Sequence, residues 1–249
     1  MQLEADNAVT SSFKLCISIS AENVEQLSRK MKRARAHKPD FLELRLDYIK
    51  NLDMSKLNQV RKLLRGNEFL TIRSRSEGGK SKMSERKRIS LISKGLLSLN
   101  PRFIDVEILT LIKHPQILSD IEITKTKLIA SFHDLEGKKT PPSLNEILSR
   151  APIKSRSLYA IKIVKQAKRI SDNQKVLSLY SHKILKGERA PKLVAFCAGE
   201  KGADSRIRCL FLGSPFSYCS LPGEPTAAGQ LDIQNMREAI AKRFPGSLG

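Results

Sequence analysis

Leu158-Tyr-Ala-Ile-Lys-Ile-Val164 is a short apolar run with a single lysine near its centre, and Lys165, Gln166 and Lys168 follow it. A run of this length that ends in β-branched residues and opens into polar residues predicts a buried strand. Burial disfavours the ammonium of a lysine, whose ordinary pKa is about 10.4, and a neutral amine is a nucleophile towards ketones. Lys162 either provides that nucleophile or extends its amine to water from the strand end. The strand alone leaves both interpretations open.

Strand-like runs alternate with helix-like runs along the chain of 249 residues, and no linker rich in Pro, Gly or Ser divides them. About 250 residues is typical of one (β/α)8 barrel. We therefore predict the α/β class and a single (β/α)8 TIM barrel over residues 13–249, after a flexible polar segment, residues 1–12. The predicted strands are 15–19, 41–46, 69–72, 103–107, 127–132, 158–164, 192–196 and 216–220; the predicted helices are 23–35, 54–64, 84–97, one within 112–121 that Pro115 interrupts, 143–149, 171–185, 205–211 and 233–244.

The cysteines and the apolar runs limit the class of protein. The four cysteines form no C-x-x-C pair and no zinc-binding spacing, so the sequence predicts neither a metal site nor a disulfide framework. Reduced thiols are typical of a cytoplasmic protein. The N-terminus is acidic and has no apolar signal region, and no apolar run approaches the ~18 residues of a membrane span. We predict a cytoplasmic protein that does not span a membrane.

The net charge of +20 raises the alternative of a nucleic-acid-binding protein, because basic chains attract polyanions. The basic residues are spread along the chain among Ser and Glu, however, and form no single tail. Aromatic residues make up 5% of the chain and Trp is absent, which argues against a surface for base stacking. Solvated helix faces are the favoured interpretation, and the same charge would also steer a small anionic substrate.

Unusual polar residues gather at the carboxyl ends of the predicted strands, where a barrel of this class carries its chemistry. Glu43, Arg45 and Asp47 alternate along the second strand and so share one face. Charges that point into a barrel are stable only if they pair with one another or with a ligand. Arg73 and Glu77 follow the third strand, in a loop with two glycines. These residues fit either internal ion pairs or a binding site.

Acidic and basic groups also end the fourth and fifth strands. Asp105 and Glu107 share one face of the fourth strand and are equally compatible with a salt bridge and with a site. Of the four histidines, only His133 lies at the carboxyl end of a predicted strand. An imidazole titrates near neutrality and can remove and return a proton. Because the strand of Lys162 is the next one, the pair favours catalysis over a histidine that is merely hydrogen-bonded in place.

Two loops complete this end of the predicted barrel. Residues 198–206 follow the seventh strand, and Ser205 is expected to cap the next helix. The N-terminus of that helix and the guanidinium of Arg206 would together bind a carboxylate. Residues 221–230 follow the eighth strand as a long, flexible loop, which can close over a ligand.

These motifs, in this order and from about Leu15 to Leu231, resemble the type I 3-dehydroquinate dehydratase family. The resemblance implies a (β/α)8 enzyme of the shikimate pathway, and hence of aromatic amino acid biosynthesis. It further implies a metal-free homodimer that dehydrates 3-dehydroquinate to 3-dehydroshikimate through a lysine imine, with no other cofactor. The matching stretches are Glu43-Leu-Arg-Leu-Asp47, Thr71-Ile-Arg-Ser-Arg-Ser-Glu-Gly-Gly79, Ser131-Phe-His-Asp134, Lys162-Ile163, Gly199-Glu-Lys-Gly-Ala-Asp-Ser-Arg206 and Thr226-Ala-Ala-Gly-Gln230.

The resemblance also implies a role for each matching residue. Lys162 is similar to the imine-forming lysine, His133 to the general acid and base, and Glu77 to the carboxylate that partners this histidine. The implied substrate-binding residues are Glu43, Arg45 and Arg73 for the ring hydroxyls, Arg206 for the carboxylate, Thr226 and Gln230 on the closing loop, and Ser18 on the floor of the site. Three positions depart from the family pattern and none is a reacting group: Ala228 replaces a proline, Tyr159 an aspartate and Ala198 a methionine.

Two other functions stay open at this point. A class I aldolase also uses a lysine inside a barrel but breaks a carbon–carbon bond, and it gives no account of Glu43, Arg45 and Gln230 together. A non-catalytic barrel would use the charge of +20 to bind RNA, and its retention of nucleic acid would then be sensitive to salt.

Overall fold

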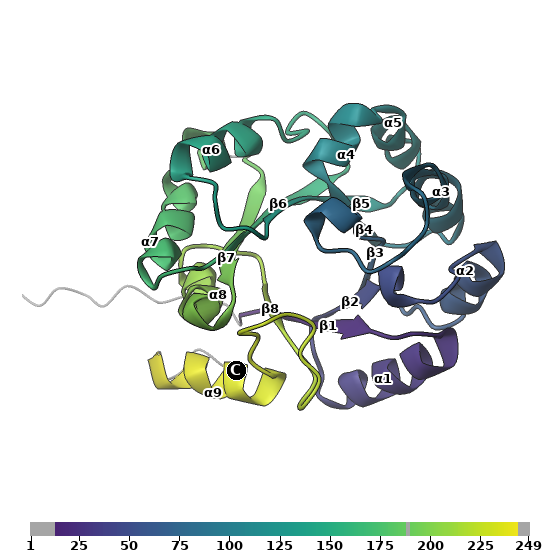
Figure 1. Ribbon diagram of the computed structural model, residues 1–249, viewed down its shortest axis with the longest axis horizontal. Coiled ribbons are helices and arrows are strands. Elements are labelled where there is room, and N and C mark those ends of the chain that lie inside the picture. The colour runs from purple at the N-terminus through teal and green to yellow at the C-terminus, as the bar shows by residue number, and fades with distance from the viewer. Residues whose placement is uncertain (1–12, 188–189, 244–249) are drawn as a thin grey trace, which may run out of the picture.

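The computed structural model describes residues 13–187 and 190–243, and within them eight parallel strands form a nearly closed barrel with helices around it (Figure 1). The hydrogen-bonded order is β7-β6-β5-β4-β3-β2-β1-β8. The predicted (β/α)8 TIM barrel is therefore confirmed, while the segment 1–12 lies outside the described residues. The strands are β1 Leu15–Ser20, β2 Phe41–Arg45, β3 Glu68–Thr71, β4 Phe103–Glu107, β5 Lys127–Asp134, β6 Leu158–Gln166, β7 Lys192–Ala198 and β8 Ser217–Cys219.

The helices lie on the outside of the barrel, and several begin where a polar side chain caps them. Asn23, Asp53 and Ser84 each accept a hydrogen bond from the backbone N–H three residues on, which satisfies a donor that the first helical turn leaves free. The helices are α1 Val24–Ala36, α2 Met54–Arg61, α3 Glu85–Ser90, α4 Ile108–Lys113, α5 Gln116–Glu122, α6 Pro141–Ser149, α7 Ser171–Leu177, α8 Ala203–Phe211 and α9 Ile233–Arg243.

Some predicted helices differ from the observed ones. The helix predicted within 112–121 is two helices, α4 and α5, and Pro115 caps the second, because a proline cannot donate the hydrogen bond that would continue the first. The helix predicted at 84–97 changes from α3 to a π-helical turn at Leu91–Leu96. The helix predicted at 171–185 is α-helical only to Leu177 and continues as short 3-10 turns.

A layer of aromatic rings fills the amino-terminal half of the barrel. Phe41 stacks on Phe69 with ring centroids 4.9 Å apart, and Phe103 and Phe216 contact Phe69 at 4.8 and 5.2 Å. Each of these residues stands at or beside the start of its strand, so their rings meet at one level. Burial of large aromatic side chains stabilises the barrel and closes this end of it to water. Polar groups further along the strands therefore stand above an apolar floor.

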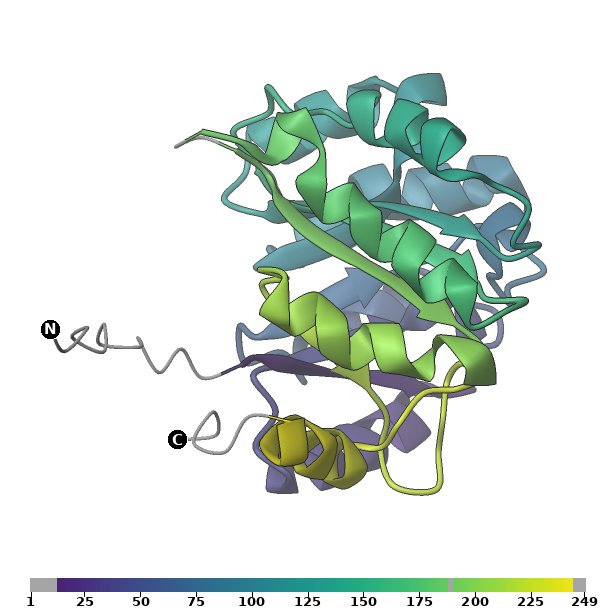
Figure 2. The ribbon, with the colours of Figure 1, turned by 90° about the vertical axis from the view of Figure 1, so that its left-hand side faces the viewer.

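The loops that follow the strands lie at the other end of the barrel. In Figure 2 the yellow-green loop after β8 lies at the end to which the strand arrowheads point. Among residues 13–187 and 190–243, no helix is both long enough and apolar enough to cross a membrane.

Candidate active site

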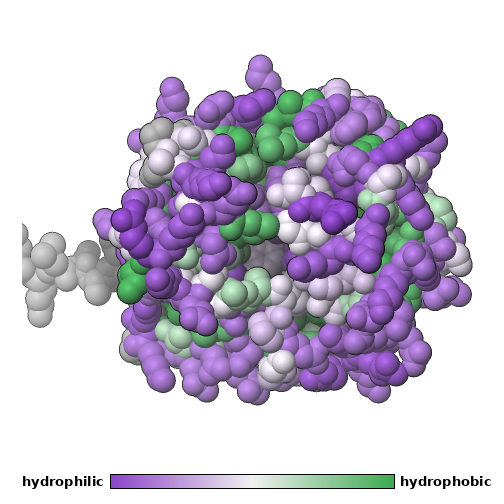
Figure 3. All heavy atoms as spheres, in the orientation of Figure 1, coloured by the Kyte–Doolittle hydropathy of each residue, from purple (hydrophilic) through white to green (hydrophobic). Residues whose placement is uncertain are grey.

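A cavity of about 290 Å³ opens among the carboxyl ends of the strands, and the face shown in Figure 3 is hollowed at its centre. Every residue predicted for the site lines this cavity. The barrel brings together side chains far apart in the sequence because its parallel strands all end on the same side. The lining includes the predicted Ser18, Glu43, Arg45, Arg73, Glu77, His133, Lys162, Arg206, Thr226 and Gln230, and also Tyr48, Gln166, Phe196 and Tyr218, which the sequence did not single out.

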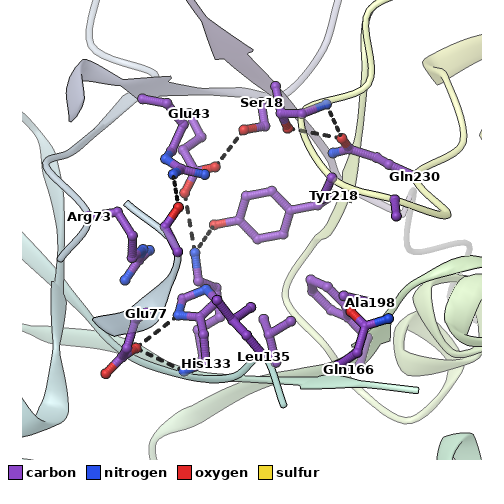
Figure 4. A pocket seen from close by; sticks show the side chains of 18 of the residues that line it. Ser18, Glu43, Arg73, Glu77, His133, Leu135, Gln166, Ala198, Tyr218 and Gln230 are labelled. Carbon is purple, nitrogen blue, oxygen red and sulfur yellow. Dashed lines mark hydrogen bonds and ion pairs between the residues drawn. The ribbon is translucent and has the colours of Figure 1, made fainter. Parts of the chain in front are cut away.

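Lys162 projects from β6 into the cavity, and only 3% of its side chain is exposed. Its Nζ lies 2.5 Å from Asp105 Oδ2 and donates hydrogen bonds of 3.2 Å to Glu43 Oε1 and 3.2 Å to the hydroxyl of Tyr218. The last two bonds are among the dashed lines in Figure 4. The interpretation that this amine reaches bulk water is therefore wrong. Burial of the strand does not make the surroundings of the amine apolar, because two carboxylates and a phenol surround the nitrogen.

Glu43 and Asp105 are ionised although both are buried. Burial opposes the carboxylate of Glu43, but the positive charges of Lys162 and Arg45 outweigh it and lower the pKa of this group. Burial likewise opposes the carboxylate of Asp105, and the charges of Arg73 and Lys162 lower its pKa well below the ordinary range. Two carboxylates therefore lie within hydrogen-bond distance of the Lys162 nitrogen.

Arg73 connects the third and fourth strands through buried ion pairs. Its guanidinium lies 2.9 Å from Asp105 Oδ1 and 3.2 Å from Glu107 Oε1, and it donates a 2.6 Å hydrogen bond to Ser131 Oγ. Burial disfavours this cation, but Asp105 and Glu107 raise the pKa of Arg73 above its ordinary value. Asp105 and Glu107 are therefore members of an internal ion-pair network, as one of the two interpretations of the sequence held.

Arg45 is oriented by Asp47, which lies in a short 3-10 turn after β2 and not on the strand itself. The Nε and an Nη of Arg45 donate hydrogen bonds of 2.8 and 2.9 Å to the two oxygens of Asp47. The backbone N–H of Lys80 donates a 3.0 Å hydrogen bond to Asp47. Asp47 thereby connects Arg45 to the loop that carries Glu77. The hydroxyl of Ser18 donates a separate hydrogen bond of 2.6 Å to Glu43.

His133 and Glu77 form a buried pair at the edge of the cavity. Glu77 Oε2 accepts the backbone N–H of His133 at 2.8 Å and lies 3.1 Å from His133 Nδ1 (Figure 4). Because this oxygen already accepts one N–H, the tautomer with a proton on Nδ1 fits best, and it leaves Nε2 free as a base. Burial, followed by the charges of Arg73 and Lys162, lowers the pKa of His133 well below its ordinary value. The imidazole is therefore neutral at pH 7.

Glu77 gives the site a measurable dependence of stability on pH. Burial raises the pKa of Glu77 to about 8, against the opposing charge of Arg73. Between its ordinary pKa of 4.5 and about 8, the folded protein holds a proton that the unfolded chain has released, so the free energy of unfolding falls as the pH rises through this window. Glu77→Gln removes this titration, and the unfolding free energy of the variant should fall by about 4 kcal/mol less than that of the wild type between pH 5 and 9.

Urea unfolding curves at a series of pH values measure this difference. Glu136→Gln is the matched control, because Glu136 is an exposed glutamate on a neighbouring loop. Its unfolding free energy should follow the wild type at each pH. Parallel curves for Glu77→Gln and the wild type would contradict the elevated pKa.

Arg206 is a buried cation that pairs with no carboxylate of the residues that the structure describes. It is 2% exposed, its guanidinium lies 4.5 Å above the ring of Phe196, and among the described residues no acceptor or carboxylate contacts its guanidinium. Burial lowers the pKa of Arg206 to about 10. A desolvated cation of this kind is costly until an anion reaches it, so the cavity is suited to a ligand with a carboxylate.

Ser205 does not cap α8, contrary to the prediction. The helix begins at Ala203, with Gly202 at the N-cap. Ser205 lies within the first turn, where its hydroxyl donates to Gly202 O at 2.6 Å and accepts the N–H of Cys197 at 2.8 Å. Ser205 therefore joins the start of α8 to β7 and sets the position of the next residue, Arg206.

The loop after β8 is folded over the cavity and tied in place. Gln230 donates to Cys219 O at 2.9 Å and accepts two bonds of 3.0 Å from the N–H and hydroxyl of Thr226. The N–H of Gly199 donates to Ala228 O at 2.9 Å. Gly229 has φ +69°, and a Cβ there would lie 2.1 Å from Gly199 O. Only glycine allows the loop to approach β7 this closely.

Two neighbours of Lys162 were missed or only half recognised in the sequence. The sequence placed Asp105 and Glu107 on one face of strand 103–107 and left a salt bridge and a site equally open, but it identified no partner for Asp105. Tyr218 lies in a short strand with no motif, and its inward orientation depends on the pairing of β8 with β1, in which Tyr218 stands opposite Cys16. Its only sequence signal was a polar aromatic residue in the middle of the predicted strand 216–220, Phe-Ser-Tyr-Cys-Ser. Over residues 13–187 and 190–243, no group of three or more His, Cys, Asp or Glu side chains is arranged to hold a metal ion.

Comparison with known proteins shows that this chain is similar in sequence to several proteins named 3-dehydroquinate dehydratase. The model of the type I 3-dehydroquinase family matches residues 15–245. The 3-dehydroquinate dehydratase of Thermococcus gammatolerans is 32% identical over 224 residues, which cover 89% of this chain and 95% of that protein. The protein of the same name from Pyrococcus abyssi is 33% identical over 225 residues, which cover 88% of this chain and 93% of the relative.

Solved structures show the same fold. The crystal structure of 3-dehydroquinate dehydratase from Geobacillus kaustophilus has a TM-score of 0.82 at 18% identity, over 94% of this chain and 93% of that one. That of type I 3-dehydroquinate dehydratase from Clostridium difficile has a TM-score of 0.78 at 19% identity, over 93% and 92% of the two chains. Because the family model spans nearly the whole barrel, the chain belongs to the type I 3-dehydroquinase family, which is a family of hydro-lyases.

Proposed function

We propose that this chain is a 3-dehydroquinate dehydratase that eliminates water from 3-dehydroquinate through an imine on Lys162, giving 3-dehydroshikimate in the shikimate pathway. The observation that carries the proposal is one cavity that holds a buried lysine, a neutral histidine and an arginine to which the described part of the chain offers no carboxylate. These are the groups needed to form an imine, to move a proton and to hold a carboxylate. The proposal includes a homodimer in the cytoplasm and no cofactor other than the imine, as the family resemblance implies.

Substrate binding follows from the charges of the cavity. Arg206 pairs with the substrate carboxylate, and this fixes the ring so that its C3 ketone faces Lys162. Glu43, Arg45 and Arg73 bind the ring hydroxyls at the other side of the cavity. Ser18 holds Glu43 through its 2.6 Å hydrogen bond. Thr226 and Gln230 bring the loop after β8 against the carboxylate end of the ring, as their mutual hydrogen bonds allow.

The chemical steps use Lys162 and His133 in turn. The Lys162 amine adds to the C3 ketone and loses water to form an iminium, which acts as an electron sink and acidifies the C2 proton. Nε2 of His133 removes that proton to give an enamine. The enamine expels the C1 hydroxyl, which takes the proton from His133, and hydrolysis of the imine then releases the product. Glu43 and Asp105 stabilise the positive iminium nitrogen, and Glu77 keeps the proton of His133 on Nδ1.

Purified protein mixed with 3-dehydroquinate should give the ultraviolet absorbance of a conjugated enone, and borohydride added with the substrate should leave a stable adduct on the Lys162 peptide. The enone arises from the elimination, and the adduct from reduction of the imine. Mass spectrometry of the digested protein locates the adduct, and protein treated with borohydride alone is the control. Products of carbon–carbon cleavage would instead indicate an aldolase. No enone and no adduct would contradict the proposal.

A further inference from the structure

We infer that Tyr218 is a further catalytic residue, whose hydroxyl engages the lone pair of the neutral Lys162 amine and then gives its proton to the ketone oxygen of the substrate. The inference rests on the proposed imine chemistry and deepens it. It concerns a residue that lies outside the motifs by which the family resemblance was recognised.

Tyr218 is packed against the reactive nitrogen. Its side chain projects from β8 into the cavity (Figure 4) and is 4% exposed. The hydroxyl lies 3.2 Å from Lys162 Nζ, and this nitrogen lies 4.6 Å from the ring centroid. Phe196 and Phe216 pack against the ring with centroids 5.8 and 5.5 Å away. Within the described part of the chain, the hydroxyl has no hydrogen-bond partner other than Lys162.

The partners of Lys162 differ in what they can do. The carboxylates of Glu43 and Asp105 only accept hydrogen bonds, whereas the hydroxyl of Tyr218 both accepts and donates. An ammonium directs three N–H groups at three acceptors. A neutral amine has two N–H groups and a lone pair, and only Tyr218 can donate to that lone pair. The hydroxyl is therefore the one neighbour of the nitrogen that fits both protonation states.

The hydroxyl of Tyr218 supplies a proton to the ketone oxygen and recovers one from the nitrogen when the amine adds to the ketone. The lone pair of Lys162 Nζ forms a bond to C3, and the electron pair of the C=O bond moves to the oxygen. The oxygen takes the phenolic proton of Tyr218, and the phenolate then takes a proton from the nitrogen, which the new bond has made positive. The products are a neutral carbinolamine and a neutral Tyr218, with no other reactant consumed.

Charged and titratable groups from several strands face Tyr218 and Lys162 and have to be considered together with them. Burial, followed by the negative charges of Glu43 and Asp105, raises the pKa of Tyr218, and the positive charge of Arg73 opposes them. The phenol is thus protonated at neutral pH and has a proton to give. The groups to be considered in any pH profile are Cys16 on β1, Glu43 and Arg45 on β2, Arg73 after β3, Asp105 on β4, His133 on β5 and Arg206 on α8.

Tyr218→Phe tests the inference when imine formation is timed by quenching with borohydride and measured by intact mass. At pH 7 the variant should form the imine at least about tenfold more slowly, because it lacks the proton donor. Its pH profile for imine formation should also change, because both protonation states of Lys162 lose their hydrogen bond to the hydroxyl. A side chain with a purely structural role would change the melting temperature but not this profile.

Tyr159→Phe is the matched control. Tyr159 lies at the amino-terminal part of β6, packs against Phe103 with centroids 5.0 Å apart, and lines no part of the cavity that holds Lys162. Its loss of a phenolic hydroxyl should leave both the rate and the profile at wild-type values. An unchanged rate and profile in Tyr218→Phe would overturn the inference while leaving the imine mechanism in place. Absence of any adduct in the wild type would instead contradict the proposed function itself.

A second variant keeps the test decisive if Tyr218→Phe does not fold. Site-specific incorporation of 3,5-difluorotyrosine at position 218 keeps the ring and the hydroxyl but makes the hydroxyl more acidic. The pH profile of imine formation should then move to lower pH. A profile identical to that of the wild type would overturn the role assigned to Tyr218.

Discussion

Lys162→Met should form no borohydride adduct with 3-dehydroquinate, and its turnover should fall about 10⁴-fold or more, as expected for loss of a covalent nucleophile. The variant has no amine at position 162 that can condense with the ketone. Among the described residues, the only other lysine that lines the cavity is Lys80, which is exposed. Enone absorbance and intact mass measure the two effects. An adduct that persists in the variant would contradict the assignment of Lys162.

The substitution should also change stability. It leaves Glu43 without the amine that is now 3.2 Å away, whereas Asp105 keeps its pair with Arg73 at 2.9 Å. Removal of one partner from a buried ion pair costs about 3–5 kcal/mol, and the remaining pair places the expected loss near the lower end. A thermal unfolding curve therefore has to show that Lys162→Met is folded at the assay temperature before its inactivity is interpreted.

Lys165→Met is the matched control for this loss of a buried lysine. Lys165 lies three residues further along β6 and is 2% exposed, but its Nζ donates 2.6 and 3.4 Å hydrogen bonds to Gly137 O and Asp134. It does not line the cavity. Lys165→Met should unfold at a lower temperature and still form the adduct. If both variants lost the adduct equally, its loss would reflect damage to β6 and not the missing nucleophile.

His133→Ala should still form the imine but lose turnover by about 10³-fold, the middle of the range for a general acid–base group. The proposed mechanism assigns the addition step to Lys162 and Tyr218, and the removal of the C2 proton to His133. The variant should therefore accumulate the imine of the substrate, which borohydride reduces to an adduct that still carries the C1 hydroxyl. Timed quenching and the enone absorbance separate the two steps.

His37→Ala is the control for this variant. His37 caps the carboxyl end of α1, before β2 begins, and is not among the residues that line the cavity. Its turnover should equal that of the wild type. Loss of imine formation together with turnover in His133→Ala would contradict the division of roles, and so would retention of turnover.

The sequence was sufficient to predict the barrel and most of the cavity lining. Apolar runs of strand length that alternate with helical patterns leave few folds open at this chain length. Because parallel strands end on one side, polar residues that follow them in sequence, such as Arg73, His133 and Arg206, could be assigned to one site before any distance was known. The predictions were wrong at local features, such as the two helices around Pro115 and the first turn of α8 around Ser205. At these places one or two hydrogen bonds decide where a helix begins or ends.

The sequence by itself determined which polar residues stand at the carboxyl end of each strand, and hence that a lysine, a histidine and an arginine share one cavity. What only the tertiary structure decided is the environment of the lysine nitrogen. Asp105, Glu43 and Tyr218 reach it from β4, β2 and β8, at separations of up to 119 residues along the chain. Those contacts depend on strand register, barrel closure and side-chain packing, which act over the whole barrel and leave no local pattern in the sequence.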